Sequence, residues 1–370
     1  MKPLFFITLL LFPFYSIAQK TDTTETVSLL FIGDIMGHYA QIESALDTTT
    51  GTYSFDRMFS KVSPLIQKAD FAIANLEVTL AGTPYSGYPR FSSPDELAVA
   101  AKKSGIDILL TANNHASDHN LKGIKRTINV LDSIEVRHTG TFLDKNHKDS
   151  SNLIIMEKGS IKVGLLNYTE STNGRRVPKP ALVNLTDTTA MKSDIEDAFS
   201  KKIDKLVVFL HWGIEYDSAP SKTQRETAQF LFEQGVDIII GAHPHVIQPM
   251  EFIQAANGNK ERFIAYSLGN FLSDQRIRKR DGGAMVEITI SKENGLSQIT
   301  DYGYHLTWVN KPLIKKRRSY EVLICKEYEA NDFKGLTEYS KNKMKRFIKD
   351  SRALLDSINV EVKEKVVVSN

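Results

Sequence analysis

The sequence predicts an α/β protein in which strands and helices alternate along one large domain. Short runs that are apolar throughout recur between stretches with helical spacing, as expected for strands buried on both faces beneath layers of helices. No segment repeats at a fixed period. The composition is globular, with 41% hydrophobic and 25% charged residues among 370. It excludes disordered, collagen-like and multi-span membrane proteins.

The individual elements follow from the length of each apolar run and from the residues that end it. The expected strands are 27–32, 71–74, 106–111, 161–166, 206–210, 236–240, 263–267 and 284–290. Helical spacing is found at 94–103, 121–133 and 222–234. Gly105 and Gly235 follow two of these helices, at the position where a left-handed residue commonly ends a helix.

The first residues have the pattern of a targeting segment. Lys2 precedes a nearly uncharged run over residues 4–17, and small residues around Ala18 resemble a cleavage site. We therefore expect residues 1–18 to be a signal peptide cleaved near Ala18. The mature protein would be exported and periplasmic or associated with the cell envelope. The apolar run is shorter than the ~20 residues that a membrane-spanning helix needs.

The alternation of strands and helices fades near the carboxyl terminus. We expect a main domain over residues 27–292 and a Lys-rich C-terminal extension over 293–370, with a basic run at 315–318 and a helical stretch at 339–358. A solvated face is the simplest interpretation of the basic run, and binding to an anionic membrane surface or an acidic polymer is the alternative. The net charge of +3 gives no indication of a nucleic-acid partner.

Side chains that can bind a metal follow five of the expected strands. They are Asp34 and His38, Asn75 and Glu77, Asn114, His115 and Asp118, His211, and His243 and His245. In open α/β sheets, ligands bind beyond the carboxyl ends of the strands. Because Cys325 is the only cysteine, a metal must be held by His, Asp, Glu and Asn side chains. This mixture suits a hard or borderline divalent ion.

Each of these residues also has a structural interpretation. Asp34 could belong to a turn, Glu77 could be a surface carboxylate, and His211 could be a hydrogen-bonded histidine at a sheet edge. His243 and His245 are harder to explain in this way, because two imidazoles two residues apart point the same way in an extended segment. The proline between them is excluded from a central strand. The repetition at five strand ends favours a metal centre assembled from separate loops.

Six motifs, in the order GDIMGH, NLE, ANNHASD, HWGIEY, GAHPHV and YSLGNF, resemble the CapA family of bacterial poly-γ-glutamate capsule synthesis proteins. The resemblance covers residues 27–290. The domain of that family is similar to calcineurin-like metallophosphoesterases. The resemblance therefore implies a four-layer α/β/β/α sandwich of the metallophosphatase type, with two mixed sheets in the middle. It also implies one or two divalent metal ions, with Mn, Zn, Fe and Mg not distinguished.

The resemblance further implies roles for the residues at the strand ends. Asp34 would be the carboxylate that can bridge two ions. The other ligands would be Glu77, Asn114, His211, His243 and His245. His115 would be the general acid, and the neighbouring Asp118 would orient its ring.

Two positions depart from the common phosphoesterase pattern. Met36 stands where that pattern has a histidine, and a thioether is a poor ligand for hard divalent ions. Glu77 follows Asn75 and Leu76, where that pattern has Asp after a glycine. The departures put full occupancy of one metal position in question. His38 and Asn75 are further candidates for binding metal or substrate.

Residues around the expected centre are candidates for substrate binding. Trp212, Glu215 and Tyr216 could form a wall of the site, and Arg90 could hold an anion. The alternatives are a packed aromatic pair and a surface arginine. Asn270 follows another expected strand, so its loop is expected to face the same cleft.

Two functions remain open from the sequence. The first is a metal-dependent hydrolase of capsule or cell-envelope polymer metabolism, acting on an ester, phosphoester or amide with a metal-activated water. The second is a non-catalytic accessory that binds an anionic polymer such as poly-γ-glutamate during its synthesis or export. The expected partners are an anionic cell-envelope polymer or its precursor, and membrane-bound polymer synthesis machinery. The full set of ligand-type residues favours the first function, and Met36 favours the second.

Overall fold

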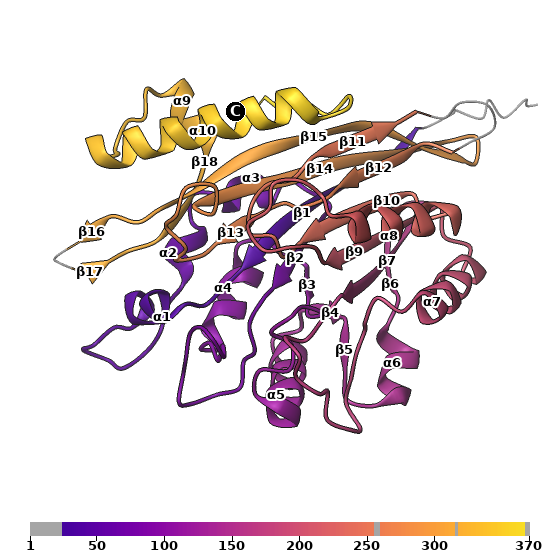
Figure 1. Cartoon of the computed structure of the whole chain (residues 1–370), viewed down its shortest axis with the longest axis horizontal. Coiled ribbons are helices and arrows are strands. Elements are labelled where there is room, and N and C mark those ends of the chain that lie inside the picture. The colour runs from indigo at the N-terminus through magenta and orange to yellow at the C-terminus, as the bar shows by residue number, and fades with distance from the viewer. Residues whose placement is uncertain (1–23, 255–259, 315–316, 367–370) are drawn as a thin grey trace, which may run out of the picture.

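Two mixed sheets run through the centre of the protein, as the computed structural model shows for residues 24–254, 260–314 and 317–366 (Figure 1). In sheet order, the larger contains β18 (Glu321–Ile324), β15 (Leu296–Asn310), β14 (Gly282–Glu293), β1 (Glu25–Ile35), β2 (Phe71–Leu76), β3 (Ile108–Leu110) and β4 (Arg137–Thr139), with β13 (Asn270–Leu272) beside the end of β1. The smaller contains β11 (Met250–Ile253), β12 (Arg262–Ala265), β10 (Ile238–Ala242), β9 (Lys205–His211), β7 (Ile161–Thr169) and β6 (Ile154–Lys158).

The remaining elements are two short ribbons and the helices. The ribbons are β5 (Thr141–Phe142) with β8 (Leu182–Val183), and β16 (Leu313–Ile314) with β17 (Arg317–Arg318). The helices are α1 (Tyr39–Ala45), α2 (Asp56–Phe59), α3 (Ser63–Ile66), α4 (Glu96–Lys103), α5 (Asn120–Ser133), α6 (Lys145–Ser151), α7 (Thr188–Ser200), α8 (Lys222–Glu233), α9 (Cys325–Ala330) and α10 (Glu338–Ile358).

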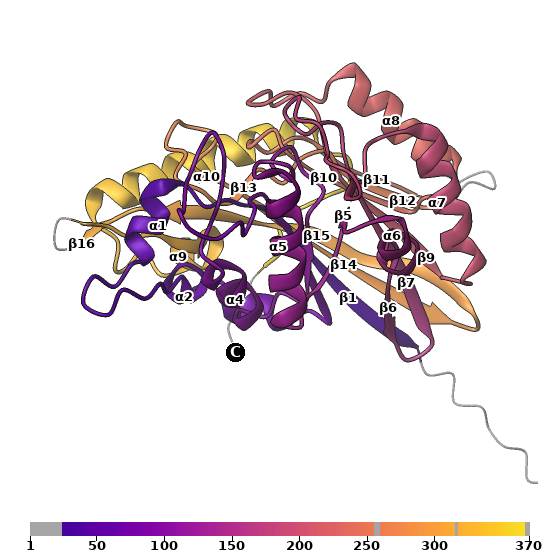
Figure 2. The ribbon, with the colours of Figure 1, turned by 90° about the horizontal axis from the view of Figure 1, so that it is seen from below.

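Three apolar cores separate four layers. The first core lies between the two sheets and joins residues such as Phe31 of the larger sheet to Phe209 of the smaller. The second packs the outer face of the larger sheet against α1 to α4, and the third packs the smaller sheet against α7 and α8. Figure 2 shows these two groups of helices on opposite sides of the sheets. The predicted α/β/β/α sandwich is confirmed.

Each of the eight expected strands and four expected helical stretches overlaps an observed element. The reason is burial: all seven residues of β9 are buried, and the five between Lys205 and His211 are all apolar. The predicted signal peptide, residues 1–18, lies outside the described residues. Within the described ranges, no helix is long and apolar enough to cross a membrane.

Residues after Glu293 are built into the larger sheet and do not form a separate appendage. The predicted boundary at 292/293 falls in the hairpin between β14 and β15, which pair from Glu293–Leu296 to Gly282–Trp308. β18 then pairs with β15, and α10 lies along β15 (Figure 1). Phe347 of α10 is fully buried in the core between the sheets. The polar, exposed first half of β15 hid this strand from the apolar pattern.

The strands that precede the expected ligands end at one edge of the molecule. Asp34 pairs in register with Asn75 in the larger sheet, and His211 pairs with Ala242 in the smaller. A hydrogen bond joins the two sheets near this edge, since the Ala112 N–H donates to Oδ1 of the buried Asn167 at 2.8 Å. The polar ends of both sheets therefore face a common site.

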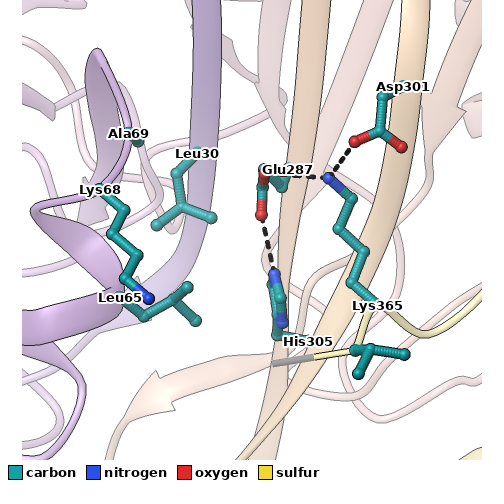
Figure 3. A pocket seen from close by; sticks show the side chains of 9 residues that line it. Leu30, Leu65, Lys68, Ala69, Glu287, Asp301, His305 and Lys365 are labelled. Atoms are coloured by element: carbon teal, nitrogen blue, oxygen red, sulfur yellow. Dashed lines mark hydrogen bonds and ion pairs between the residues drawn. The ribbon is translucent and has the colours of Figure 1, made fainter. Parts of the chain in front are cut away.

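A charged network ties the last described residues to the outer face of the larger sheet (Figure 3). The Lys365 ammonium donates to Glu287 at 2.9 Å and to Asp301 at 2.6 Å. Nε2 of the buried His305 lies 2.9 Å from the other Glu287 oxygen. These groups line a cavity of about 410 Å³. The hydrogen bond from His305 and the Lys365 charge lower the pKa of Glu287 from 4.5 to about 2.

Replacing Glu287 by Gln should destabilise the protein in a pH-dependent manner. Because the folded-state pKa is depressed, the carboxylate stabilises the fold above pH 4.5, and this contribution is lost as the pH falls towards 2. We expect Glu287→Gln to lower the free energy of unfolding by about 1–2 kcal/mol at pH 7, since the side chain is only 26% exposed.

Urea unfolding between pH 7 and pH 3 measures this difference, which should shrink as the pH falls. Glu293→Gln, at the exposed end of the same strand, is the control and should change stability little. A loss that is equal at every pH would contradict the assignment of the network.

Candidate metal centre

Asp34 and Asn75 lie side by side at the ends of β1 and β2, and both are fully buried. The Asn75 amide donates to Asp34 Oδ1 at 2.7 Å and approaches Nδ1 of His211 at 3.1 Å. A residue of the larger sheet therefore contacts one of the smaller sheet at the centre of the site. The Asn75 Oδ1 has no hydrogen-bond partner among the described residues, so Asn75 stays a candidate for binding metal or substrate.

Glu77, just beyond β2, is a fully buried carboxylate. Among the described residues, neither of its oxygens has a hydrogen-bond partner. Its Oε1 lies 3.5 Å from Nε2 of His211 and 3.7 Å from Nε2 of His245. Burial, followed by the charge of Asp34, raises its pKa well above the usual range. A charged group in this position needs a cation to offset the cost of its burial.

Two groups of three side chains are close enough to hold an ion each. One consists of Glu77, His211 and His243, and the other of Asp34, Glu77 and His245; within each group the ligand atoms lie within 4.8 Å of one another. Asn114 adds an oxygen to the first group, since its Oδ1 lies 3.0 Å from Nε2 of His211. The residues therefore fit a divalent metal, with nitrogen and oxygen donors and a buried negative charge.

Glu77 belongs to both groups, whereas Asp34 belongs to one. We expected Asp34 to be the carboxylate that can bridge two ions, whereas this grouping would favour Glu77 in that position. The physical reason is its place between the sheets, where one carboxylate oxygen faces both His211 and His245. Asp34 instead contacts His245, whose Nδ1 lies 3.1 Å from Asp34 Oδ2.

His243 and His245 do not lie in an extended segment, contrary to the expectation from their spacing. Their φ angles are +98° and +57°, which are uncommon for residues other than glycine. The turn sends the two rings to different groups, His243 to His211 at 3.0 Å and His245 to Asp34. Backbone strain of this kind is concentrated at functional sites, where the surroundings hold it in place.

Burial also sets the protonation state of the imidazoles. It lowers the pKa of His211 well below its usual range, with the nearby His243 and His245 adding to the effect. Burial and His245 lower the pKa of His243 to about 4. Both rings are therefore neutral at pH 7, which is the form that binds a metal.

His115 and Asp118, the predicted general acid and its orienting carboxylate, are in contact. Nδ1 of His115 lies 2.7 Å from Asp118 Oδ2, and both side chains are buried. Because a carboxylate can only accept, Nδ1 carries the proton. The Phe91 N–H also donates to Asp118 at 2.7 Å, and the Phe91 ring meets the His115 ring edge to face at 4.6 Å. The orientation of His115 is therefore fixed on two sides.

Met36 and His38, which lie two and four residues after Asp34, do not join either ligand group. Met36 is buried in the core beneath the helices that cover the larger sheet. His38 begins α1, and its Nδ1 lies 3.0 Å from Gln41 Oε1. The group formed by Asp34, Glu77 and His245 thus lacks a histidine from this segment.

The structure places the expected substrate-binding residues in different surroundings. The prediction for Trp212 is wrong: its side chain is fully buried, and its indole N–H donates to the Tyr266 carbonyl at 2.9 Å. Asn270 is also buried, and its amide donates to the Arg280 carbonyl at 2.9 Å. The Arg90 guanidinium donates to the Asp118 carbonyl at 2.7 Å, so it supports the segment that follows His115.

Glu215 and Tyr216 are exposed beside the ligand groups. The Tyr216 ring lies 6.0 Å from the His245 ring. Burial, followed by a hydrogen bond with Glu215, raises the pKa of Tyr216 to about 12. Arg280 was not expected here, yet its guanidinium lies 3.2 Å from the centre of the Tyr216 ring. The only sequence signal for it is the high density of basic residues at 276–280.

Arg175 is a second residue that the sequence did not indicate. Its Nε lies 3.5 Å from Asp118 Oδ1, the oxygen that His115 does not use. The pairing joins a loop after β7 to a residue after β3, and no local pattern indicates such a contact. Arg175 adds a positive charge behind the carboxylate that orients His115.

The comparisons with known proteins agree with this architecture. The family model for "Bacterial capsule synthesis protein PGA_cap" matches residues 28–275. The chain is 29% identical over 289 residues to the capsule biosynthesis protein CapA of Bacillus anthracis, covering 75% of this chain and 66% of that protein. It is 28% identical over 300 residues to the PGA biosynthesis protein CapA of Bacillus subtilis, covering 77% and 74%.

Among solved structures, the NAD nucleotidase NadN of Haemophilus influenzae is similar with a TM-score of 0.50 at 14% identity, over 93% of this chain and 65% of that one. This likeness concerns the fold, and it agrees with the two packed sheets described above. The family match spans the five strand ends that carry the predicted ligands. The chain belongs to the PGA_cap family of bacterial capsule synthesis proteins.

Proposed function

We propose that this protein is a metal-dependent hydrolase of capsule or cell-envelope polymer metabolism. The observation that carries the proposal is the pair of ligand groups sharing Glu77, next to the oriented His115. A protein that only binds a polymer has no need for a buried carboxylate without hydrogen-bond donors. That arrangement is costly unless a cation is held there.

His115 is the residue that donates a proton to the leaving group in the proposed reaction. Its Nδ1–H donates to Asp118, so Nε2 is the atom that holds the second proton of the imidazolium form and gives it to the leaving oxygen or nitrogen, after which the ring is neutral and keeps its proton on Nδ1. Asp118 is fixed by the Phe91 N–H and by Arg175, so the ring does not need to reorganise during the reaction. A bound divalent ion supplies an activated water and polarises the bond to be cleaved.

The proposed substrate class is taken from the relatives. The printed names of the relatives concern capsule and PGA biosynthesis, and we infer a polymer of the poly-γ-glutamate type or its precursor. Export to the periplasm or cell envelope, and contact with membrane-bound synthesis machinery, belong to the same proposal. The chain spans 66% of the Bacillus anthracis relative, so these inferences apply to the part that is shared.

Metal binding should depend on Glu77 more than on any other single carboxylate. In a calorimetric titration of the full chain with Mn²⁺, we expect Glu77→Gln to weaken binding at both positions by more than about tenfold, because it belongs to both groups. His245→Ala should affect only the position it shares with Asp34.

Asp118→Asn is the matched control, because it also converts a buried carboxylate to an amide but lies outside both groups. It should retain the Mn²⁺ stoichiometry of the wild type. Excess metal should also raise the unfolding temperature of the wild type, because metal at a hundred times its Kd increases the free energy of unfolding by about 2.7 kcal/mol. Wild-type affinity in Glu77→Gln would refute the shared ligand.

Replacing His115 should lower the rate of catalysis and leave the amount of bound metal unchanged. We expect His115→Gln to lower kcat by about 10²- to 10⁴-fold on whichever substrate is cleaved in a panel of phosphodiesters, poly-γ-glutamate and peptidoglycan fragments. Asp118→Asn should lower kcat less, because it disturbs the orientation of the ring and leaves the ring in place.

His138→Gln is the control, since His138 lies within β4, pairs with the exposed Asp132 and belongs to neither ligand group. It should leave kcat unchanged. If the metal-loaded wild type cleaves nothing in the panel but binds poly-γ-glutamate, the accessory function replaces the hydrolase. If His115→Gln retains full activity, His115 is not the general acid.

A further inference from the structure

A basic groove lies between α10 and the loop that joins β13 to β14. It is a cavity of about 310 Å³, lined by Arg276, Arg278, Asp281, Tyr339, Asn342, Lys343 and Arg346. A smaller cavity of about 60 Å³ shares four of these residues and adds Lys311 and Arg318 among others. We refer to the two cavities together as the basic groove. The family match ends at residue 275, just before the first of its residues.

Positive charge exceeds negative charge in the basic groove. Six lining side chains are cationic, and one, Asp281, is acidic. Acidic neighbours compensate only part of this charge. Asp274 pairs with Arg276 at 2.7 Å, and Asp350 pairs with Arg278 at 2.8 Å. An excess of charge gathered in a concave surface attracts ligands of the opposite sign.

Two lysines of the groove contact neutral groups in the described part of the chain. The Lys343 ammonium lies 5.1 Å from the centre of the Tyr339 ring, and Lys311 donates to the Gln275 carbonyl. Burial is the main reason that the pKa of Lys311 is lowered to about 8. Asp274 and Asp281 raise this pKa, and Arg276 and Arg318 lower it. Neither ammonium forms an ion pair within the described residues, so both can bind an anion in the groove.

The loop that forms one wall of the basic groove also reaches the metal centre. Arg276 lines the groove, while Arg280, four residues later, lies over Tyr216 beside His245. Four residues span at most roughly 14 Å. The Asn270 amide, next to Asp34 in the sheet, holds the Arg280 carbonyl and so fixes this end of the loop. The groove and the metal centre thus lie within the reach of one extended chain.

We propose that the basic groove binds a distal part of the anionic chain whose reacting bond lies at the metal centre. This inference rests on the proposed function. The ligand carries carboxylate or phosphate groups repeated along a flexible backbone, because the forked guanidinium of arginine binds either group. The groove selects long chains over short ones, since a short ligand in the metal centre does not reach it.

The basic groove can be tested by measuring how anionic probes bind to the full chain, with no need for any probe to be cleaved. The probes are poly-γ-glutamate and polyphosphate of about ten units, long enough to span roughly 14 Å, and a γ-glutamyl dipeptide. We expect Lys343→Glu with Arg346→Glu to weaken binding of a long probe by about 10- to 100-fold and to leave dipeptide binding unchanged. Both side chains are exposed on α10, so the fold should tolerate the change.

Lys345→Glu with Lys349→Glu is the matched control. It reverses two exposed charges on the same helix, outside the groove, and should change affinity by less than about threefold. The better of the two long probes identifies the charged group of the ligand. Equal weakening by both pairs of substitutions, or equal affinity for short and long glutamyl probes, would overturn the proposal. The binding pattern can hold when no substrate is cleaved, so the groove and the hydrolase fail independently.

Discussion

The buried carboxylate of Glu77 is the constraint on which the metal centre depends. It projects from the larger sheet, has no hydrogen-bond donor among the described residues, and faces imidazoles from the smaller sheet. An uncompensated carboxylate in such a place costs several kcal/mol. Cations held in the two groups that share Glu77, one with His211 and His243 and the other with Asp34 and His245, would offset that cost. Metal binding, as proposed, would therefore join the two sheets at this residue.

The candidate ligands stand out in the sequence because they lie at the ends of strands with buried, apolar interiors or just beyond them. In β9 the residues between Lys205 and His211 are all apolar, so the polar residue at its end is conspicuous. Asp34, Glu77 and His211 were proposed from this signal. The same signal misassigned Trp212, which also follows β9 but turns back into the core to bond the Tyr266 carbonyl. Position along the chain identifies a strand end, but it does not tell which way the side chain points.

The features that the sequence did not predict depend on contacts between distant segments. β15 alternates between polar and apolar residues and becomes recognisable as a strand only through its pairing with β14. The sharing of Glu77 depends on how the two sheets meet, and the separation of His243 from His245 depends on positive φ angles. Arg175 and Arg280 reach the site from loops, where no periodicity marks a functional residue.

The ligand groups and the basic groove lie in different parts of the chain, and this separation bears on substrate specificity. The ligand groups and His115 all lie within residues 28–275, the part matched by the family, whereas the basic groove is formed by residues after 275. The groove is carried by the same segment that completes the larger sheet, so it is held rigidly with respect to the metal centre through β14 and β15. The charge of α10 can therefore change without disturbing the ligands, because its buried face packs on the sheet and its basic face lies outside it. Under the proposed function, the strand ends would supply the chemistry, and the C-terminal helix would select which anionic chains are held near it.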